Sequence, residues 1–472
     1  MDRPAGGKMN VVKRTVSQTS VALVGVLVVV GAAPIAAAAS RHPDRSGASS
    51  FSADTSLIRG HGELAVISRD RSLYLMGGKL SGAHKVALTD PAGDPAWSHD
   101  GRWLAVITQP APPTSQPADE PTTIWLVSRA GKVVRRLTPA GQDVYHATAA
   151  WSPTADRLAI SYTADVTSPA GATQRIDVVT TSGATTALAS APNISGFAWS
   201  PSGRRLAVGL NHFVLPAGKW RSRLVVFTLA SGSHRAVSTV NGDILDVAGW
   251  WPDGSGVLAW RDYQGSGSLA ADGLPLLDIS TATGHRRQLT KTMLQYEGWL
   301  ATSKVTNEVA FIAGGDRILT NGHKHLVVCS HRRCRSIAQP KRKVSFDPAW
   351  SPGGRLAVVR DRAVKAVNGN YLFSYTRKVD DSGGIALVRG RHVHALTGAT
   401  GGTAPVWGRG GSMLFVRGSS LWFLRAGSTR PRRVAGPLSS SDSFYGFVSW
   451  WDSFAWTAAV ADRGRSGSPQ VI

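Results

Sequence analysis

Eight polar or aromatic residues stand shortly before tryptophans that recur along this chain, and they carry its most obvious chemistry. They are Asp94, His146, Asn193, Asp246, Tyr296, Glu297, Asp347 and Tyr445. If these positions meet in space, their carboxylates could receive a cation or a basic peptide segment. The simpler interpretation is that the Asp-Pro pairs at 94–95 and 347–348 only cap turns, as aspartate often does. Both interpretations stay open.

Catalytic motifs are missing from the sequence. It contains no G-x-S-x-G elbow, no H-E-x-x-H motif and no Walker phosphate loop. The HVH segment at 392–394 could seat a metal, but a solvated strand explains it more simply. We therefore predict a non-enzymatic binding protein with no cofactor and no metal. The alternative is a hydrolase or lyase whose acid and base lie among Asp94, His146, Glu297 and Asp347.

The two cysteines enclose a short turn. Cys329 and Cys334 flank the residues SHRR between two short strand-like segments, which predicts a hairpin with one cysteine on each strand. Facing strand ends satisfy the geometry of a disulfide, and such a bond suits an oxidising compartment. We predict the disulfide. Free thiols, or a metal site that includes His331, remain as alternatives.

Tryptophans mark an internal repeat that organises the chain. The segments PAWSHDGRWLAVI (95–107), AAWSPTADRLAIS (149–161), FAWSPSGRRLAVG (197–209) and AWSPGGRLAVV (349–359) share one pattern, and three weaker copies and one partial copy align with them. The aligned residues are Trp97, Trp151, Trp199, Trp250, Trp299, Trp350, Trp407 and Trp450. We interpret these eight of the 16 tryptophans as structural residues that wedge between repeats.

Each repeat has the composition of four short strands. An apolar segment ends at the tryptophan, a Ser-Pro-x-Gly turn follows, and an alternating strand such as RRLAVGL comes next. An apolar third strand and a basic, polar fourth strand complete the unit. Four-stranded units of about 50 residues that recur in this way are typical of the blades of a β-propeller. The fold class is therefore predicted as all-β.

The A-W-S-P-x-G-x-x-L-A-V unit resembles the repeat of TolB-type β-propellers, which are relatives of the Trp-Asp-repeat propellers. The resemblance covers about residues 61–460, and the aspartate usual in the family's turn is kept at Asp100 and Asp253. It is replaced by Thr154, Ser202 and Gly353 in other copies. TolB also has a separate domain before its propeller, whereas residues 41–60 here are predicted as a flexible linker. The resemblance therefore does not imply a Tol–Pal role.

The two ends of the repeat array complement each other. The first three strands, from residue 61, lack a tryptophan strand before them, and the last copy, around Trp450, lacks its outer strands. Pairing the chain ends would close the ring and remove exposed edges. This predicts a single propeller of eight blades over 61–460, with seven as the alternative, followed by a flexible tail at 461–472.

The N-terminal segment predicts export. Lys8, Lys13 and Arg14 precede an uncharged apolar run over 21–39 that ends in small residues. This pattern is typical of a signal peptide over residues 1–40. The run is also just long enough for an uncleaved transmembrane anchor. Either way, we expect the propeller in the cell envelope or outside the cell, most simply as a monomer.

Long insertions fall in one class of loop, between the second and third strands of the repeats. They are the segments 107–123, 161–174, 211–222, 261–273 and 359–384. In a propeller these loops share one face, here called the long-loop face, with the blade-to-blade connections and the eight residues named first. Insertions confined to one face often mark a binding face. We predict that a protein partner or an envelope ligand binds there.

The chain is strongly basic, with 53 Lys and Arg against 30 Asp and Glu and a net charge of +23. Clusters at 331–335, 341–343, 389–394 and 429–433 are expected mostly on fourth strands, at the outer rim of the ring. Export makes nucleic acid an improbable ligand, and aromatic residues do not alternate with the clusters. Attachment to anionic envelope polymers through this rim is a further alternative, beside a merely solvated rim.

Overall fold

The computed structural model describes residues 50–78, 80–110, 120–141, 143–164, 172–214, 217–263, 265, 272–296, 298–315, 323–363, 383–442 and 448–457. The predicted export segment (1–40), residues 41–49 of the predicted linker and the tail (461–472) lie outside these residues. Among the described residues, no helix is both long enough and apolar enough to cross a bilayer. The regular structure there consists of β-strands and two short 3₁₀ helices, η1 (Thr55–Leu57) and η2 (Trp451–Ser453).

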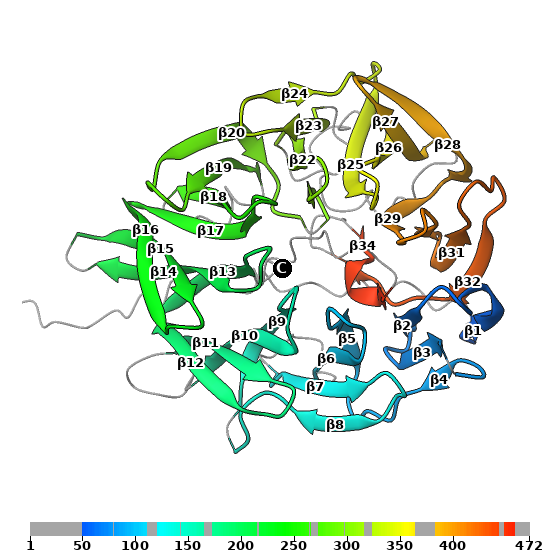
Figure 1. The fold of residues 1–472 in the computed structure, drawn as a ribbon, viewed down its shortest axis with the longest axis horizontal. Coiled ribbons are helices and arrows are strands. Elements are labelled where there is room, and N and C mark those ends of the chain that lie inside the picture. The colour runs from blue at the N-terminus through cyan, green and yellow to red at the C-terminus, as the bar shows by residue number, and fades with distance from the viewer. Residues whose placement is uncertain are drawn as a thin grey trace, which may run out of the picture. The chain divides into compact units, whose positions relative to one another are not determined.

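Eight antiparallel sheets stand around a centre and form a β-propeller (Figure 1), which confirms the predicted fold class and the eight-blade count. Blade 1 contains β35 (Phe454–Trp456), β2 (Glu63–Ile67), β3 (Leu73–Gly77) and β4 (His84–Lys85). Blade 2 contains β5 (Ala92–Trp97), β6 (Trp103–Thr108), β7 (Thr123–Ser128) and β8 (Val133–Arg136). Blade 3 contains β9 (Tyr145–Trp151), β10 (Arg157–Ala164), β11 (Thr173–Thr180) and β12 (Thr185–Ala191). Blade 4 contains β13 (Asn193–Trp199), β14 (Arg205–Val214), β15 (Lys219–Thr228) and β16 (Ser233–Asn241).

The second half of the ring repeats this order from the innermost strand outward. Blade 5 contains β17 (Asp243–Trp250), β18 (Gly256–Tyr263), β19 (Leu274–Ser280) and β20 (Arg286–Met293). Blade 6 contains β21 (Leu300–Ser303), β22 (Glu308–Ala313), β23 (His325–Cys329) and β24 (Cys334–Ser336). Blade 7 contains β25 (Lys343–Trp350), β26 (Leu356–Arg362), β27 (Gly384–Arg389) and β28 (His392–Thr400). Blade 8 contains β29 (Thr403–Trp407), β30 (Met413–Arg417), β31 (Ser420–Leu424), β32 (Arg432–Gly436) and β1 (Ser52–Ala53). A separate small sheet pairs β33 (Ser441–Asp442) with β34 (Val448–Ser449).

Both described ends of the chain close the ring, as the complementary end copies predict. The C-terminal β35 is the innermost strand of blade 1, where it pairs with β2. The N-terminal β1 adds a fifth, outermost strand to blade 8, where it pairs with β32. Residues 52–58, predicted as linker, therefore belong to the propeller: Leu57 and Ile58 are buried in the core that joins blades 8 and 1. The predicted boundary at residue 61 is too late because so short a strand has no repeat signature.

In blades 2, 3, 4, 5 and 8, the repeated tryptophan bonds its blade to the blade before it. The indole Nε1–H of Trp151 donates to the carbonyl oxygen of Ala96 at 2.9 Å. The same bond joins Trp97 to Ala455, Trp199 to Ala150, Trp250 to Ala198 and Trp407 to Ala349. A buried indole needs a hydrogen-bond acceptor, and the neighbouring innermost strand supplies one. Each such tryptophan side chain thus contributes both buried apolar surface and a hydrogen bond to the contact between two blades.

An arginine at the start of the second strand completes this contact from the preceding blade. The guanidinium of Arg205 lies 4.9 Å from the ring centroid of Trp250 and donates to the carbonyl oxygen of Gly254 at 2.7 Å. The pairs Arg157 with Trp199 and Arg355 with Trp407 stack in the same way. We call this arrangement the Trp–Arg clasp. It explains part of the basic excess, since these arginines bind the next blade.

The last copy of the repeat is centred on Trp456 rather than on Trp450. Ala455 and Trp456 pair with Ala65 and Leu64, the register in which Ala96 and Trp97 pair with their own second strand. Trp450 precedes η2 and is only half-buried. The sequence analysis predicts the first tryptophan of VSWWDSFAW as the repeat residue, although the FAW at the end of this segment is identical to the FAW that ends β13.

Blade 6 also departs from the aligned position. In its innermost strand, Ala301 pairs with Ala310 and Thr302 with Val309, so Thr302 stands where other blades carry tryptophan. Trp299, the aligned residue, lies three positions earlier, where it is fully buried and packs edge-on against Tyr296. Blade 6 therefore presents no clasp tryptophan to blade 5. It is the least regular member of the ring.

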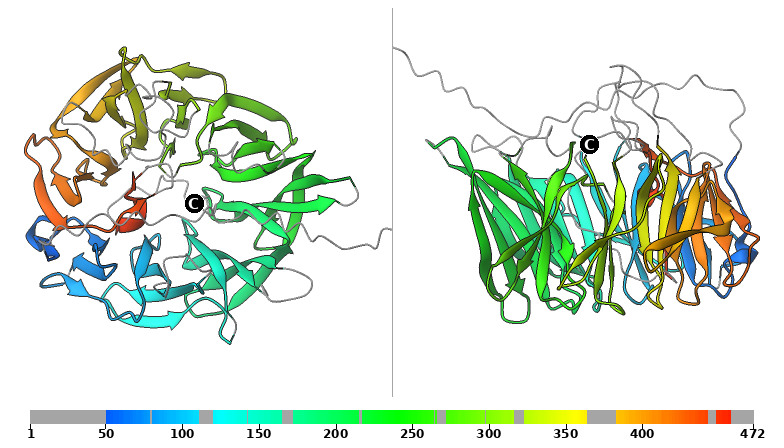
Figure 2. Two further views of the ribbon diagram at one scale, coloured as in Figure 1. Left: turned by 180° about the vertical axis from the view of Figure 1, so that it is seen from behind. Right: turned by 90° about the horizontal axis from the view of Figure 1, so that it is seen from above.

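The strand order defines two faces of the ring. The turns from first to second and from third to fourth strand lie on one face, here called the short-turn face. The long-loop face carries the second-to-third connections and the blade-to-blade connections. In blades 2, 3, 5, 6 and 7 those second-to-third connections are the longest, whereas in blades 1 and 8 they are short turns. In the side view of Figure 2, η2, drawn in red, lies at the edge of the ring on the long-loop side.

Candidate functional site

Three of the eight residues named first share an unusual backbone conformation. Asp94, His146 and Asp347 have φ angles of 49°, 51° and 48°, in the left-handed region, and each lies in an innermost strand. The pairing register shifts beside Asp94 and beside Asp347, which marks a β-bulge. Aspartate and histidine tolerate this conformation better than most L-residues. The residue types at these positions are therefore explained by the bulge, rather than by the turn caps of the simpler interpretation.

Neighbouring strands also use the polar groups at these positions. The Asp347 carboxylate is buried and accepts hydrogen bonds from the Thr403 hydroxyl at 3.0 Å and the Ala404 amide at 3.1 Å, both in blade 8. Asn193 accepts a bond from the Asn211 side chain of its own blade at 2.7 Å. These contacts join strands and leave Asp347 with little freedom to bind a ligand.

Asp246 links three blades at the long-loop end of the innermost strands. Its carboxylate accepts a hydrogen bond from Nε2 of Gln295, in the connection to blade 6, at 2.7 Å. Burial raises the pKa of Asp246 to about 6, although hydrogen bonds from Gln295 and from Ser195 of blade 4 oppose that rise. A carboxyl that titrates near pH 6 is a candidate acid or base wherever a substrate can reach it.

Residues of the chain itself lie at the channel mouth on this side. Trp451 of η2 is buried, and its indole packs so closely on Gly298 that an added Cβ there would lie 2.3 Å from Nε1. Because η2 also packs against β5 of blade 2, it contacts both blade 2 and the start of blade 6. Figure 1 shows the red segment beside β5, near the centre of the ring. Tyr296 packs on Trp299 in the core. Glu297 and Tyr445 lie outside the described residues.

The candidate acids that the structure describes do not assemble into a metal site. Among the described residues, one group of three side chains is close enough to hold an ion, and it consists of His99, Asp100 and Asp156 on the short-turn face. The guanidinium of Arg102 lies between the two carboxylates and pairs with both. An arginine there already neutralises the charge that a cation would need. None of the eight residues named first belongs to this group.

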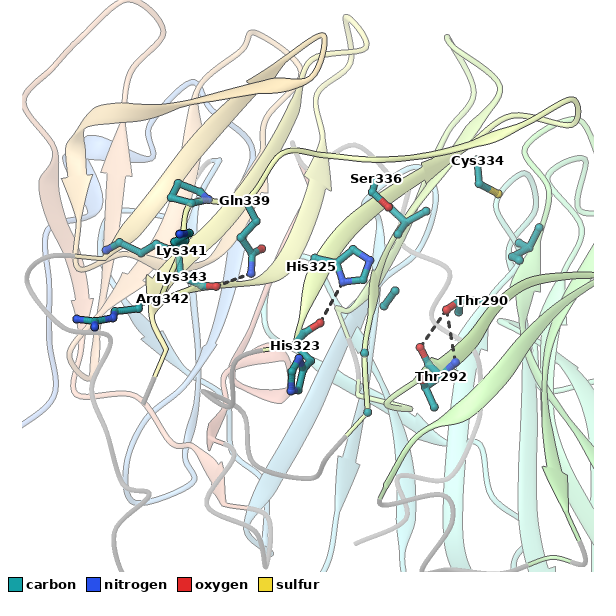
Figure 3. A pocket seen from close by; sticks show the side chains of 16 residues that line it. Thr290, Thr292, His323, His325, Cys334, Ser336, Gln339, Lys341, Arg342 and Lys343 are labelled. Carbon is teal, nitrogen blue, oxygen red and sulfur yellow. Dashed lines mark hydrogen bonds between the residues drawn. The ribbon is translucent and has the colours of Figure 1, made fainter. Parts of the chain in front are cut away.

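A groove of about 900 Å³ lies at the irregular blade 6 (Figure 3). It separates β20 of blade 5 from β23 and β24, and the segment before β25 forms its other wall. The fourth strand β24 has three residues, whereas β16 and β28 have nine and β20 has eight. The short strand leaves the flank of blade 5 uncovered at this point. The same weak repeat that omits the clasp tryptophan thus opens the groove.

The lining of the groove is cationic and rich in hydrogen-bond donors. Its charged or titratable side chains are His323, His325, Lys341, Arg342 and Lys343, and no described carboxylate lines it. Its other polar side chains are Thr290, Thr292, Ser336 and Gln339. Such a surface attracts anions, because lysine and arginine donate charge-assisted hydrogen bonds to carboxylate and phosphate oxygens.

Hydrogen bonds orient several of these side chains. The amide of Gln339 donates to the carbonyl oxygens of Lys324, at 2.9 Å, and Lys343, while its own oxygen accepts from the Ser345 hydroxyl at 2.8 Å. The bond to Lys324 holds the wall of the groove to blade 6. Figure 3 shows the bond from Gln339 to Lys343. Nδ1 of His325 lies 3.0 Å from the carbonyl oxygen of His323. A carbonyl can only accept, so Nδ1 of His325 carries the proton in this bond.

The four basic clusters divide between the two faces. Residues 341–343 lie in the connection from blade 6 to blade 7, on the long-loop face, rather than on a fourth strand. The clusters at 331–335, 389–394 and 429–433 begin in third-to-fourth strand turns on the short-turn face and run into fourth strands. The first of these holds the disulfide, since Cys329 and Cys334 are bonded across the turn. Of the four clusters, only the one at 341–343 contributes charged side chains to the groove.

Sequence reasoning missed most of the groove. It singled out the KRK cluster and the cysteine at the rim, but not His323, His325 or the threonines of β20. The usable signal was the weak repeat itself: the copy at Trp299 is degenerate, and only a few residues separate Cys334 from the basic cluster. Which strands lie beside that gap depends on sheet pairing between distant segments.

A smaller pocket of about 420 Å³ lies on the short-turn face where the ring closes. Its lining includes Glu63, Asp100, Arg129 and Arg409, which together carry both signs of charge. Glu63 is buried and pairs with Arg129 at 2.7 Å. Its carboxylate also accepts a hydrogen bond from Thr457, next to the closing strand β35. This pocket therefore serves ring closure and offers less unpaired charge than the groove.

Comparison with known proteins adds solved structures but no family. No family model matches the chain, and no curated protein matches its sequence. The β-propeller domain of the Trilobed protease from Pyrococcus furiosus is 11% identical, with a TM-score of 0.41, and the match covers 72% of this chain and 96% of that one. A putative TolB from Agrobacterium tumefaciens is 12% identical, with a TM-score of 0.37 over 58% and 87% of the two chains. An oligogalacturonate lyase in complex with manganese is 12% identical, with a TM-score of 0.41 over 72% and 83%. We take no activity, ligand or partner from these similarities.

Proposed function

We propose that this chain is an exported, non-enzymatic β-propeller that binds an anionic envelope ligand with its long-loop face. The observation that carries the proposal is the groove at blade 6, with five cationic or titratable side chains and no described carboxylate in its lining. The non-enzymatic part of the proposal is supported by Asp347 and Asp246. Their carboxylates accept hydrogen bonds from neighbouring strands or connections.

The chemistry of the groove favours a polymer that carries carboxylate or phosphate groups. Lys341 and Arg342 are exposed, and Lys343 is half-buried, so the three cations offer contacts along one wall. The opposite wall offers threonine hydroxyls, which suit the hydroxyl and ester oxygens of such a polymer. An open groove that extends along the flank of a blade suits an extended chain better than a small enclosed molecule.

The test measures binding of the full chain to poly-glutamate and to polyphosphate, with neutral dextran as a reference. Replacing Lys341, Arg342 and Lys343 together with glutamine should weaken binding at least tenfold at about 0.1 M salt. The matched control removes three exposed charges from the short-turn face, by Arg332→Gln, Arg389→Gln and Arg391→Gln. It should leave binding within about twofold, because exposed charges more than about 10 Å away are screened at moderate salt.

Two results would overturn the proposal. Equal losses in the two triple variants would show that only net charge matters, and that the groove is not the site. Turnover of either polymer by the unaltered chain would favour the hydrolase or lyase alternative. A preference for poly-glutamate or for polyphosphate distinguishes a carboxylate ligand from a phosphate ligand.

A further inference from the structure

The hairpin of blade 4 extends further than its neighbours on the long-loop side. Strands β14 and β15 have ten residues each, whereas β10 and β11 of blade 3 have eight. Near its end, Phe213 pairs with Trp220 and Val214 pairs with Lys219. Because this hairpin is a second-to-third strand connection, its end lies on the long-loop face.

Apolar side chains are exposed at the end of this hairpin. Phe213 and Val214 are 44% and 39% exposed, and Tyr263 at the end of β18 in blade 5 is 39% exposed. The Phe213 ring packs edge-on against Trp220 at 5.4 Å. We call Phe213, Val214, Trp220 and Tyr263 the aromatic corner. Single exposed apolar residues are ordinary on a protein surface, but a group of this kind marks an interaction site.

Backbone contacts place Trp220 of blade 4 close to Tyr263 of blade 5. The carbonyl oxygen of Trp220 accepts a bond from the amide of Gly242 at 2.7 Å. The next residue, Asp243, pairs with Tyr263 across the first two strands of blade 5. The corner is therefore fixed by sheet pairing on both sides.

The charge around the aromatic corner is positive. Lys219, Arg221 and Arg223 are exposed on β15. Arg261 lies 4.9 Å from the ring centroid of Tyr263 and pairs with the buried carboxylate of Asp243 at 2.6 Å. The exposed surface therefore combines aromatic and apolar groups with cations. This combination suits the interface of an anionic bilayer, where aromatic rings enter the headgroup region and cations meet lipid phosphates.

The course of the chain also favours an orientation with the long-loop face toward the bilayer. Strand β1 runs antiparallel to β32, and Ser52 pairs with Gly436, which ends β32 at the long-loop face. The chain therefore enters the propeller on the face that carries the aromatic corner. Twelve residues, 40–51, separate Ser52 from the apolar run at 21–39. They span about 43 Å at most, so a retained anchor would keep the long-loop face near the bilayer.

We infer that the long-loop face docks on an anionic lipid bilayer, with the aromatic corner placed in the headgroup region. The surface is separate from the groove, and this inference does not depend on the proposed polymer ligand. Docking in this orientation would hold the groove close to the membrane.

Matched labels on the two faces test the inference in the full chain. Val214→Cys places a thiol in the aromatic corner, and Val305→Cys places one in the exposed first-to-second strand turn of blade 6, on the short-turn face. The native cysteines are disulfide-bonded, so each variant has one reactive thiol. Each is labelled with an environment-sensitive fluorophore and mixed with vesicles of phosphatidylglycerol and phosphatidylcholine that contain brominated acyl chains.

We expect quenching at position 214 to exceed that at position 305 at least threefold. Adding Lys219→Glu and Arg221→Glu to the Val214→Cys variant should weaken vesicle binding at least 25-fold, since each cation near such a surface contributes about fivefold. Arg332→Glu with Arg391→Glu, which makes the same charge change on the short-turn face, should have little effect. Melting curves of each variant show that it is folded.

Three outcomes would overturn the inference. Equal quenching at positions 214 and 305 would mean that the propeller has no preferred face toward the bilayer. Absence of quenching at both positions would exclude docking. If position 214 is quenched as strongly by vesicles of phosphatidylcholine alone as by vesicles that contain phosphatidylglycerol, anionic lipid has no role in docking.

Discussion

Two interfaces of blade 5 differ in what holds them. Toward blade 4, the contact is the Trp–Arg clasp, in which Trp250 donates to the carbonyl of Ala198 and Arg205 stacks on its ring. Toward blade 6, Thr302 replaces the tryptophan and the clasp is missing. The chain uses the disulfide turn there instead, which brings His331 to within 2.8 Å of Asp253.

The contact to blade 6 is made by residues other than the repeat tryptophan. The His331 ring lies 4.2 Å from that of Trp251, and Asn307 donates to Asp253 at 3.1 Å. The carbonyls of Ser330 and His331 accept from Arg287. These contacts lie on the short-turn face, and the opposite end of the same interface is left as the groove. Where a blade keeps the repeat pattern, the repeat residues hold it to its neighbour. Where the pattern is weak, as in blade 6, the polar surface of the groove becomes accessible.

The largest effect should come from the repeat tryptophan at the ring closure. Trp456→Ala removes a buried ring that packs on Phe423 and donates to the carbonyl of His61 at 2.7 Å. We expect the free energy of unfolding to fall by about 3–5 kcal/mol, as for other buried aromatic residues. Denaturant unfolding measures it. Trp450→Ala is the control, with an expected loss of about 1 kcal/mol or less, and a larger loss there would restore Trp450 as the repeat residue.

An intermediate effect should follow opening of the disulfide at the blade 5–6 interface. Replacing Cys329 and Cys334 with serine frees a turn of few residues, so the chain-entropy contribution lost is about 2 kcal/mol. The unaltered chain in reductant should unfold at the same denaturant concentration as the variant. If reduction leaves stability unchanged, the contacts of His331 hold the interface without the disulfide.

The smallest effects should be changes in folding stability that depend on pH. They should have opposite signs at the two ends of the interface between blades 5 and 6. Burial raises the pKa of Asp253, but bonds from Ser255, Asn307 and His331 outweigh it and hold that pKa well below its usual range. Its stabilising contribution is present above about pH 4 and is lost as the pH falls. Asp253→Asn should therefore cost about 1 kcal/mol at pH 7, after allowance for solvent screening, and less at pH 3.

Asp246, at the long-loop end, should behave in the opposite way. Its folded pKa of about 6 lies above the unfolded value, so its ionised form is penalised in the folded state. The penalty is absent below about pH 4 and complete above pH 6. Asp246→Asn should therefore gain stability relative to the unaltered chain as the pH rises from 4 to 7, by about 1–2 kcal/mol. Parallel pH profiles for the two variants, measured by denaturant unfolding, would contradict the contrast.

Much of the ring could be predicted from local pattern. The tryptophan spacing, the Gly and Pro turns and the alternating strands are short-range features, so they predicted eight four-stranded blades and closure by the chain ends. Local pattern failed at Trp299 and Trp450, because two tryptophans near one repeat position look alike until strand register separates them. It also placed the start of the propeller too late, because the two residues of β1 can be recognised as a strand only by their pairing with β32.

The candidate site was less predictable for the same reason. The residues before each tryptophan are polar in sequence, but the tertiary structure uses Asp94 and His146 as bulge formers and binds Asp347 to the next blade. The sequence alone determined the repeat, the basic excess and the cysteine pair, because composition and spacing are local properties. Only the tertiary structure decided which cations meet in the groove and which aromatic residues are exposed, because both depend on strands far apart in the chain.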